Sequence, residues 1–147
     1  MTTFFRDLAK GEDIEYKVLN IIRDKYPKAY KIEGYFKDYD IFIPEIQKGI
    51  EVKSDLMSKD TGNIVVEIEF NGKPSALSTT KADYWIWYDG DYLTFFKPKD
   101  IHRCISENNL FYRKFIGKGD VKEKKAYLIK KNILYKYAID KKSILWD

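Results

Sequence analysis

Residues 39–54, YDIFIPEIQKGIEVKS, contain two short runs rich in the residue types of β-strands. The runs span 39–44 and 49–54, and a break that begins at Pro44 separates them. We expect them to form consecutive strands of one β-sheet. This pair of strands decides the fold, because it fixes which polar side chains come together.

Three ionisable side chains in this stretch are placed by strand geometry. Side chains of a strand alternate between its two faces, so Glu51 and Lys53 share one face, about 7 Å apart. If the two strands pair, Asp40 approaches Glu51, and the two carboxylates can chelate one hard cation. Lys53 would then orient a metal-bound water and lower its pKa for attack on a phosphodiester. A solvent-facing cross-strand ion pair is the alternative interpretation.

The rest of the chain predicts one helix and one strand before this stretch, and further strands and helices after it. Apolar residues at 14, 18, 21 and 22 recur at helical spacing between Gly11 and Tyr26, and Pro27 ends the pattern. Further patterns predict strands at 30–36, 63–70, 84–88, 92–96, 111–116 and 126–129, and helices at 73–81, 97–105 and 132–138. The order predicts one α/β domain over residues 1–147, with a central mixed β-sheet flanked by helices.

The scarcity of cysteine and histidine disfavours several classes of site. The chain has one residue of each kind, Cys104 and His102, too few for an intrachain disulfide or a closed zinc site of these ligands. Because His102 is the only imidazole available and the chain has no G-x-S-x-G motif, Ser-His-Asp and Cys-His catalysis are also disfavoured. We therefore expect both residues to be packing residues, and the chemistry to depend on carboxylates, lysines or hydroxyls.

The sequence offers no segment suited to a membrane. The longest run without Asp, Glu, Lys or Arg is the seven residues 74–80, whereas a bilayer span needs about 20 apolar residues. The first ten residues lack the apolar core of a secretory signal. These observations predict a cytoplasmic protein with no membrane partner.

Charge is distributed unevenly along the chain. Residues 1–96 contain 13 Lys/Arg and 17 Asp/Glu, whereas residues 97–147 contain 14 and 6. The asymmetry favours a cation-binding centre in the first part and a surface for a polyanion in the last third, although a Lys-rich solvated surface would give the same counts. With 23 Lys and 4 Arg, we expect contacts to the nucleic-acid backbone rather than to bases. The candidate phosphate-binding residues are Lys118, Lys124, Lys125, Lys130 and Lys131.

Asp40, followed eleven residues later by Glu51-x-Lys53 within a helix-strand-strand-strand order, resembles the core of the PD-(D/E)XK nuclease superfamily. The resemblance implies a restriction-endonuclease-like fold and a Mg²⁺- or Mn²⁺-dependent deoxyribonuclease, with Asp40 and Glu51 as metal ligands. Tyr39 replaces the proline that the family has before the aspartate. This departure removes no ligand.

Two further segments extend the resemblance. The opening Lys10-Gly11-x-x-x-Glu15 is similar to the helix start of archaeal Holliday junction resolvases in the superfamily, and implies that Glu15 adds a carboxylate to the metal site. Segments 63–67, 72–75 and 80–85 look like phage members, which implies a virus-encoded protein acting in the host cell. Junction resolvases of this fold act as dimers, so the resemblance also implies a homodimer; it makes branched DNA one candidate substrate without identifying the DNA structure.

Secondary candidates each have a competing structural interpretation. Glu67 can extend the acidic cluster or simply face solvent. Ser75 and Lys81 can hold a scissile phosphate, but helix capping and solvation explain them better. The alternating aromatics at 84–88 favour core packing over base stacking. Residues 117–120 lack the spacing of a phosphate-binding loop and predict a turn.

A function from another class competes with the nuclease. A non-catalytic nucleic-acid-binding or regulatory module can keep the same fold with a degenerate site. The complete set of Asp40, Glu51 and Lys53 argues against it, since loss of activity usually erodes one of the three. The choices between DNA and RNA, and between branched and linear substrates, stay open from the sequence.

Overall fold

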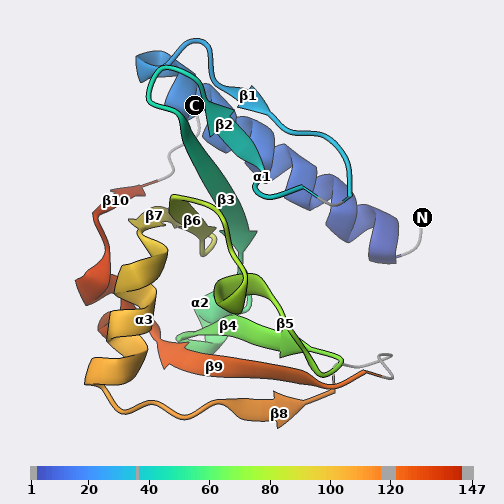
Figure 1. Cartoon of the computed structure of the whole chain (residues 1–147), viewed down its shortest axis with the longest axis vertical. Helices are drawn as coiled ribbons and strands as arrows, with labels where there is room; N and C mark the ends of the chain where they lie inside the picture. Colours follow the sequence, from blue (N-terminus) through green and yellow to red (C-terminus); the bar gives the residue numbers. More distant parts are fainter. Residues whose placement is uncertain (1–2, 36, 117–121, 144–147) are drawn as a thin grey trace.

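The computed structural model describes residues 3–35, 37–116 and 122–143, and in it the chain forms two β-sheets with helices beside them (Figure 1). The strands are β1 (Tyr30–Lys31), β2 (Ile41–Ile43), β3 (Lys48–Ser54), β4 (Asn63–Phe70), β5 (Lys73–Pro74), β6 (Tyr84–Tyr88), β7 (Tyr92–Phe96), β8 (Arg113–Phe115), β9 (Lys124–Lys130) and β10 (Asp140–Ser143). The α-helices are α1 (Thr3–Lys25), α2 (Ser58–Thr61), α3 (Pro98–Glu107) and α4 (Lys131–Leu134), and the 3₁₀ turns are η1 (Ala76–Ser78) and η2 (Tyr135–Tyr137).

The first sheet has the strand order β1-β2-β3-β6-β7-β10. It is mixed, because β3 and β6 run parallel whereas the other neighbours are antiparallel. Helix α1 packs on this sheet and buries Ile14 and Val18 against Ile41 and Ile50. The helical spacing of the apolar residues in α1 places them on one face, which explains why that face is the buried one.

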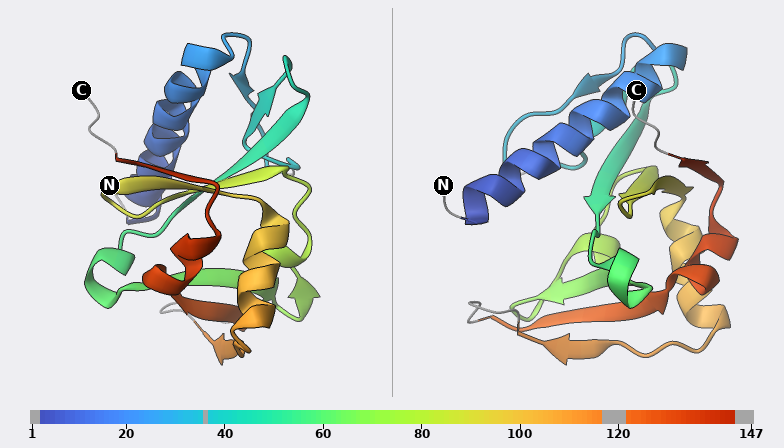
Figure 2. Two further views of the ribbon diagram at one scale, coloured as in Figure 1. Left: turned by 90° about the vertical axis from the view of Figure 1, so that its left-hand side faces the viewer. Right: turned by 180° about the vertical axis from the view of Figure 1, so that it is seen from behind.

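The second sheet is antiparallel and has the order β5-β4-β9-β8. Ile64 and Val66 of β4 pack in one core with Trp85 and Trp87 of the first sheet, and α3 adds Cys104 to it. The connection from β3 to β6 contains β4 and β5, so the chain leaves the first sheet, builds part of the second and returns. Figure 2 shows the second sheet at the end of the molecule away from α1.

The mixed α/β class, the mixed sheet and most elements agree with the sequence analysis, but the expectation of one sheet is wrong. Strands 63–70 and 84–88 and the turn at Asp89-Gly90 have the predicted bounds. The predicted helix at 73–81 is reduced to the 3₁₀ turn η1, which follows β5. The predicted terminal helix is two short turns followed by β10, which pairs with β7. No helix in the described residues is long and apolar enough to cross a bilayer.

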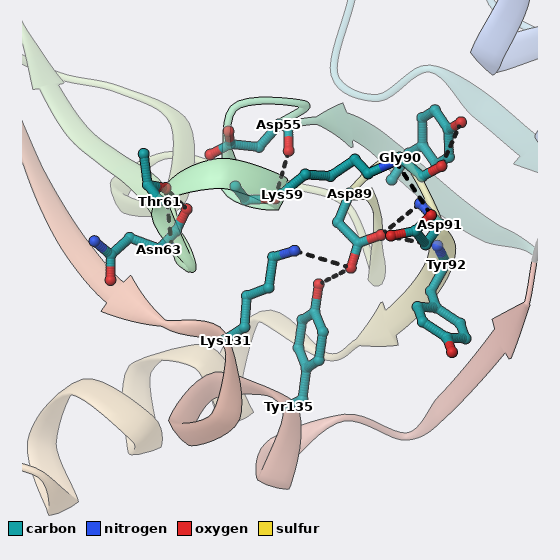
Figure 3. A network of polar contacts seen from close by, with 12 residues as sticks. Asp55, Lys59, Thr61, Asn63, Asp89, Gly90, Asp91, Tyr92, Lys131 and Tyr135 are labelled. Carbon is teal, nitrogen blue, oxygen red and sulfur yellow. Dashed lines mark hydrogen bonds and ion pairs between the residues drawn. The ribbon is translucent and has the colours of Figure 1, made fainter.

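A buried carboxylate ties the β6–β7 turn to the C-terminal turns (Figure 3). Asp89 is 1% exposed; its Oδ2 accepts a hydrogen bond of 2.6 Å from the Tyr135 hydroxyl and lies 3.6 Å from the Lys131 ammonium. Its Oδ1 accepts hydrogen bonds from the backbone N–H groups of Asp91 and Tyr92. Burial alone would oppose ionisation, but these donors and Lys131 hold the pKa of Asp89 below its usual value. We call Asp89, Lys131 and Tyr135 the Asp89 latch.

Candidate functional site

Asp40, Glu51 and Lys53 lie together, as strand pairing predicts. The N–H of Asp40 donates to the carbonyl of Ile50 at 2.9 Å, which sets Asp40 beside Glu51 on the neighbouring strand. Glu51 and Lys53 share a face, and Glu51 Oε1 lies 3.4 Å from Lys53 Nζ. The alternation of side chains along β3 therefore places both groups as predicted.

The Asp40 carboxylate continues the hydrogen-bond ladder beyond the end of β2. Its Oδ2 accepts a hydrogen bond of 2.7 Å from the backbone N–H of Val52, the donor that a longer β2 would have satisfied. The residue is 5% exposed, so this bond orients a nearly buried carboxylate. Asp40 Oδ1 points elsewhere and lies 3.0 Å from the ammonium of Lys37. One oxygen thus fixes the side chain and the other contacts a cation.

Helix α1 brings a third carboxylate to this cluster. Glu15 Oε1 lies 3.6 Å from Lys37 Nζ, and Glu15 Oε2 lies 3.5 Å from Lys31 Nζ. Burial of Glu15, together with the hydrogen bond and the negative charge of Asp40, raises its pKa to about 7. We call Glu15, Asp40 and Glu51 the carboxylate cluster.

The pKa of Glu51 is shifted in the same direction as that of Glu15. Burial and the charge of Asp40 raise the pKa of Glu51 above its usual value, although Lys53 and Lys37 act in the opposite direction. Ionisation of the whole carboxylate cluster therefore costs electrostatic free energy, since neighbouring carboxylates disfavour one another's ionisation. A bound cation would relieve that cost.

Lys37 was missed by the sequence analysis, and it supplies positive charge to the cluster. It lies in the segment between β1 and β2, where strand or helix periodicity does not determine the direction of a side chain. Its ammonium contacts Glu15 and Asp40 together, and these carboxylates favour its charged form although burial opposes it. Its position three residues before Asp40 was the one available signal.

The carboxylate cluster suits a hard divalent cation, because all the ligand atoms that it offers are carboxylate oxygens. As the side chains stand, however, the described residues contain no group of three or more His, Cys, Asp or Glu side chains arranged to hold a metal. Lys37 occupies one side of the Asp40 carboxylate. Binding of a metal at Asp40 Oδ1 would therefore require the Lys37 ammonium to withdraw.

A polar cavity of about 340 Å³ opens beside Glu51 and Lys53. Glu67 lines it from β4 and accepts a hydrogen bond of 2.9 Å from Ser75 Oγ. Lys81 also lines it, but its exposed ammonium lies 3.8 Å from Asp38. The structure thus brings all three secondary candidates to the cavity or its border.

The buried aromatic residue Trp85 lines one side of the cavity. Trp85 lies 1% exposed and its Nε1 donates a hydrogen bond of 2.9 Å to Thr80 Oγ1. Lys53 Nζ lies 5.4 Å from the centre of the Trp85 ring, within the range of a cation–π contact. Trp85 and Trp87 are core residues, which confirms the packing interpretation of strand 84–88.

The candidate phosphate-binding lysines are divided by the structure. Lys130 is exposed at the end of β9, whereas Lys125 contacts Glu69 at 2.8 Å and Lys124 lies over the ring of Phe70. Lys131 belongs to the Asp89 latch and is largely buried. Lys118 and the predicted turn at 117–120 lie outside the described residues.

One prediction about packing fails on α3. Cys104 is buried as expected, but His102 is exposed. Ile101 and Cys104 are three residues apart and share the buried face of the helix, so the intervening position 102 faces solvent.

Comparison of the chain with protein-family models, with curated proteins and with solved structures finds no match in any of the three.

Proposed function

We propose that this protein is a metal-dependent nuclease of the PD-(D/E)XK type that hydrolyses DNA phosphodiester bonds. The observation that supports this most directly is the meeting of Asp40 and Glu51 on paired strands, with Lys53 on the same face as Glu51. The order of α1 followed by three antiparallel strands, β1 to β3, supports a restriction-endonuclease-like core. A branched substrate and a homodimer are part of the proposal through the sequence resemblance alone.

Each residue of the site has a distinct role in the proposed reaction. Asp40 and Glu51 would hold Mg²⁺ or Mn²⁺, and Glu15 would support them from α1. The bound ion supplies Lewis acidity and lowers the pKa of the attacking water. Lys53, whose ammonium lies beside Glu51, would donate a hydrogen bond to the attacking water and orient it toward the phosphorus.

A nuclease assay tests the proposal directly. Linear, nicked and branched DNA are incubated with the wild-type protein in Mg²⁺, in Mn²⁺ and in a chelator. We expect metal-dependent cleavage of at least one substrate and loss of that cleavage in Lys53→Gln. Lys48→Gln, which alters a partly exposed lysine on the same strand, is the matched control and should cleave normally. Cleavage that persists in the chelator, or in Lys53→Gln, contradicts the assignment.

One observation favours the second candidate, a non-catalytic nucleic-acid-binding module. Lys37 already contacts Glu15 and Asp40, and Lys53 contacts Glu51, so all three carboxylates have a cationic partner without a metal. If no substrate is cut with either metal while DNA is bound, this second function replaces the first.

A further inference from the structure

Edge strand β8 and the two residues before it carry exposed aromatic and cationic side chains. Phe111 and Tyr112 precede the strand, and the two residues are 87% and 45% exposed. Arg113 and Lys114, which come next in the chain, are also exposed. We call these four residues the β8 patch. Figure 1 places β8 at the end of the molecule away from α1, so the patch is separate from the carboxylate cluster. A phenylalanine that is 87% exposed contributes little to packing, and aromatic rings among cations form the kind of surface that binds nucleic-acid strands.

The strand register places two lysines directly opposite one another. Lys114 pairs with Lys125 across β8 and β9. Like charges in this position destabilise a sheet. Lys125 is compensated by Glu69 at 2.8 Å, and its ammonium lies 5.4 Å from the centre of the Tyr112 ring. Among the described residues, no acidic side chain lies within ion-pair distance of Lys114.

The next set of cross-strand partners in the second sheet also combines aromatic rings with cations. Lys124 is in register with Phe70 on one side and with Phe115 on the other. The ammonium groups of Lys122 and Lys124 lie 6.0 and 5.9 Å from the centre of the Phe70 ring. The end of this sheet therefore alternates π faces with positive charge over three strands.

We propose that the β8 patch binds a single-stranded nucleic-acid segment, with unpaired bases stacking on Phe111 and Tyr112 and the phosphate backbone contacting Arg113 and Lys114. Aromatic rings among cations suit this ligand, because every base has a π face and every nucleotide a negative phosphate. A duplex offers the phosphates but keeps its bases stacked inside. The inference rests on the proposed function only in making the bound segment part of a nuclease substrate.

Equilibrium binding without metal tests the patch. Fluorescence anisotropy is measured in a chelator with labelled oligothymidine and oligouridine of about 20 nucleotides and with a DNA duplex of equal length. We expect the double variant F111A/Y112A to bind at least one of the single strands about tenfold or more weakly, with little change for the duplex. The single strand that F111A/Y112A binds more weakly than the wild type does shows whether the β8 patch binds DNA, RNA or both.

Matched variants separate stacking from charge and from general surface effects. Tyr30→Ala removes an aromatic side chain of similar exposure, 47%, from the edge strand of the other sheet and should leave affinity unchanged. Lys114→Gln should weaken both single-stranded and duplex binding and reduce the slope of log affinity against log salt by about one. Phe111→Ala alone alters a side chain that is almost fully exposed, so it keeps the test valid if the double variant does not fold.

Two results would overturn the inference. One is equal affinity of the wild type and F111A/Y112A for both single strands. The other is a change from dimer to monomer in F111A/Y112A at unchanged strand affinity, which would show that a second copy of the chain covers the patch. The cleavage assay distinguishes failure of this inference from failure of the proposed function. If Lys53→Gln loses cleavage while F111A/Y112A binds single strands as the wild type does, the proposed nuclease function is kept and only the inference about the β8 patch is wrong.

Discussion

The carboxylate cluster and the Asp89 latch both place nearly buried acidic groups beside lysines, but their electrostatics are opposite. In the latch, Tyr135, Lys131 and two backbone amides surround one carboxylate, and the pKa of Asp89 is lowered. In the cluster, several carboxylates share a site, and the pKa values of Glu15 and Glu51 are raised.

The difference separates a structural acid from the acids of the proposed site. A carboxylate with a full set of donors stabilises the fold, because ionisation is easier in the folded than in the unfolded chain. A carboxylate forced to share a site with others destabilises the fold when ionised, and groups of this kind are concentrated at functional sites. Asp89 belongs to the first class, and Lys131, predicted from the sequence as a phosphate contact, neutralises it instead.

The largest expected effect is on cleavage, from Asp40→Asn. The variant keeps an acceptor for the Val52 N–H but removes the charge of a proposed metal ligand, so cleavage should fall to background. Its affinity for DNA without metal should hold or rise, because a negative charge beside the phosphate is gone. Its melting temperature should stay near that of the wild type. Asp60→Asn, on the exposed helix α2, is the control, and cleavage by Asp40→Asn at the wild-type rate would remove Asp40 from the site.

The next largest effect is on stability, from Asp89→Ala. This change leaves Lys131 and the backbone amides of the turn without their buried acceptor, so unfolding should become easier by about 3 kcal/mol. Tyr135→Phe removes one donor from the same carboxylate and should cost about 1 to 2 kcal/mol. Urea unfolding measures both. If Asp40→Asn destabilises the protein more than Asp89→Ala, the distinction between the two regions is wrong.

The sequence predicted the parts of both regions that local periodicity determines. Alternation along β3 placed Glu51 and Lys53 on one face, and the Asp89-Gly90 turn followed from its residue types. Lys37 escaped prediction because it lies in a connecting segment and acts through contacts with α1 and β2.

The second sheet escaped prediction for a related reason. The pattern of residues 63–70 identifies a strand but does not name its partner, and β4 pairs with β9, which lies far along the chain. Val66 and Ile129 have the same apolar character that they would have in the first sheet. The strand β10 likewise depended on tertiary packing, whereas the exposure of His102 follows from the helical spacing of Ile101 and Cys104.

The pH dependence of stability should differ in sign between the two regions. The lowered pKa of Asp89 gives stability that is present above about pH 4 and is lost as pH falls through the folded-state pKa. The raised pKa of Glu15 acts in the opposite sense: its contribution is fully present below about pH 4 and is lost as pH rises through about 7.

Urea unfolding of the wild type and Glu15→Gln across this range checks both signs. The wild type should lose stability between about pH 5 and pH 7, and Glu15→Gln should lose less, because Gln does not ionise. Glu33→Gln, an exposed carboxyl, is the control and should follow the wild type. Equal slopes for the wild type and Glu15→Gln would show that Glu15 has an ordinary pKa.

The smallest expected effect comes from Lys37→Met, which tests whether this ammonium competes with a metal. Lys37 lies 3.0 Å from Asp40 Oδ1, so a metal must displace it to use that oxygen. Removing it should lower the Mg²⁺ concentration for half-maximal cleavage by about two- to fivefold, the strength of a partly exposed ion pair. Without metal, the same variant should be less stable than the wild type, since Glu15 and Asp40 lose a shared partner. Lys28→Met, an exposed lysine beyond α1, should change neither quantity. A higher Mg²⁺ requirement in Lys37→Met would mean that Lys37 holds Asp40 in position for the metal instead of competing with it.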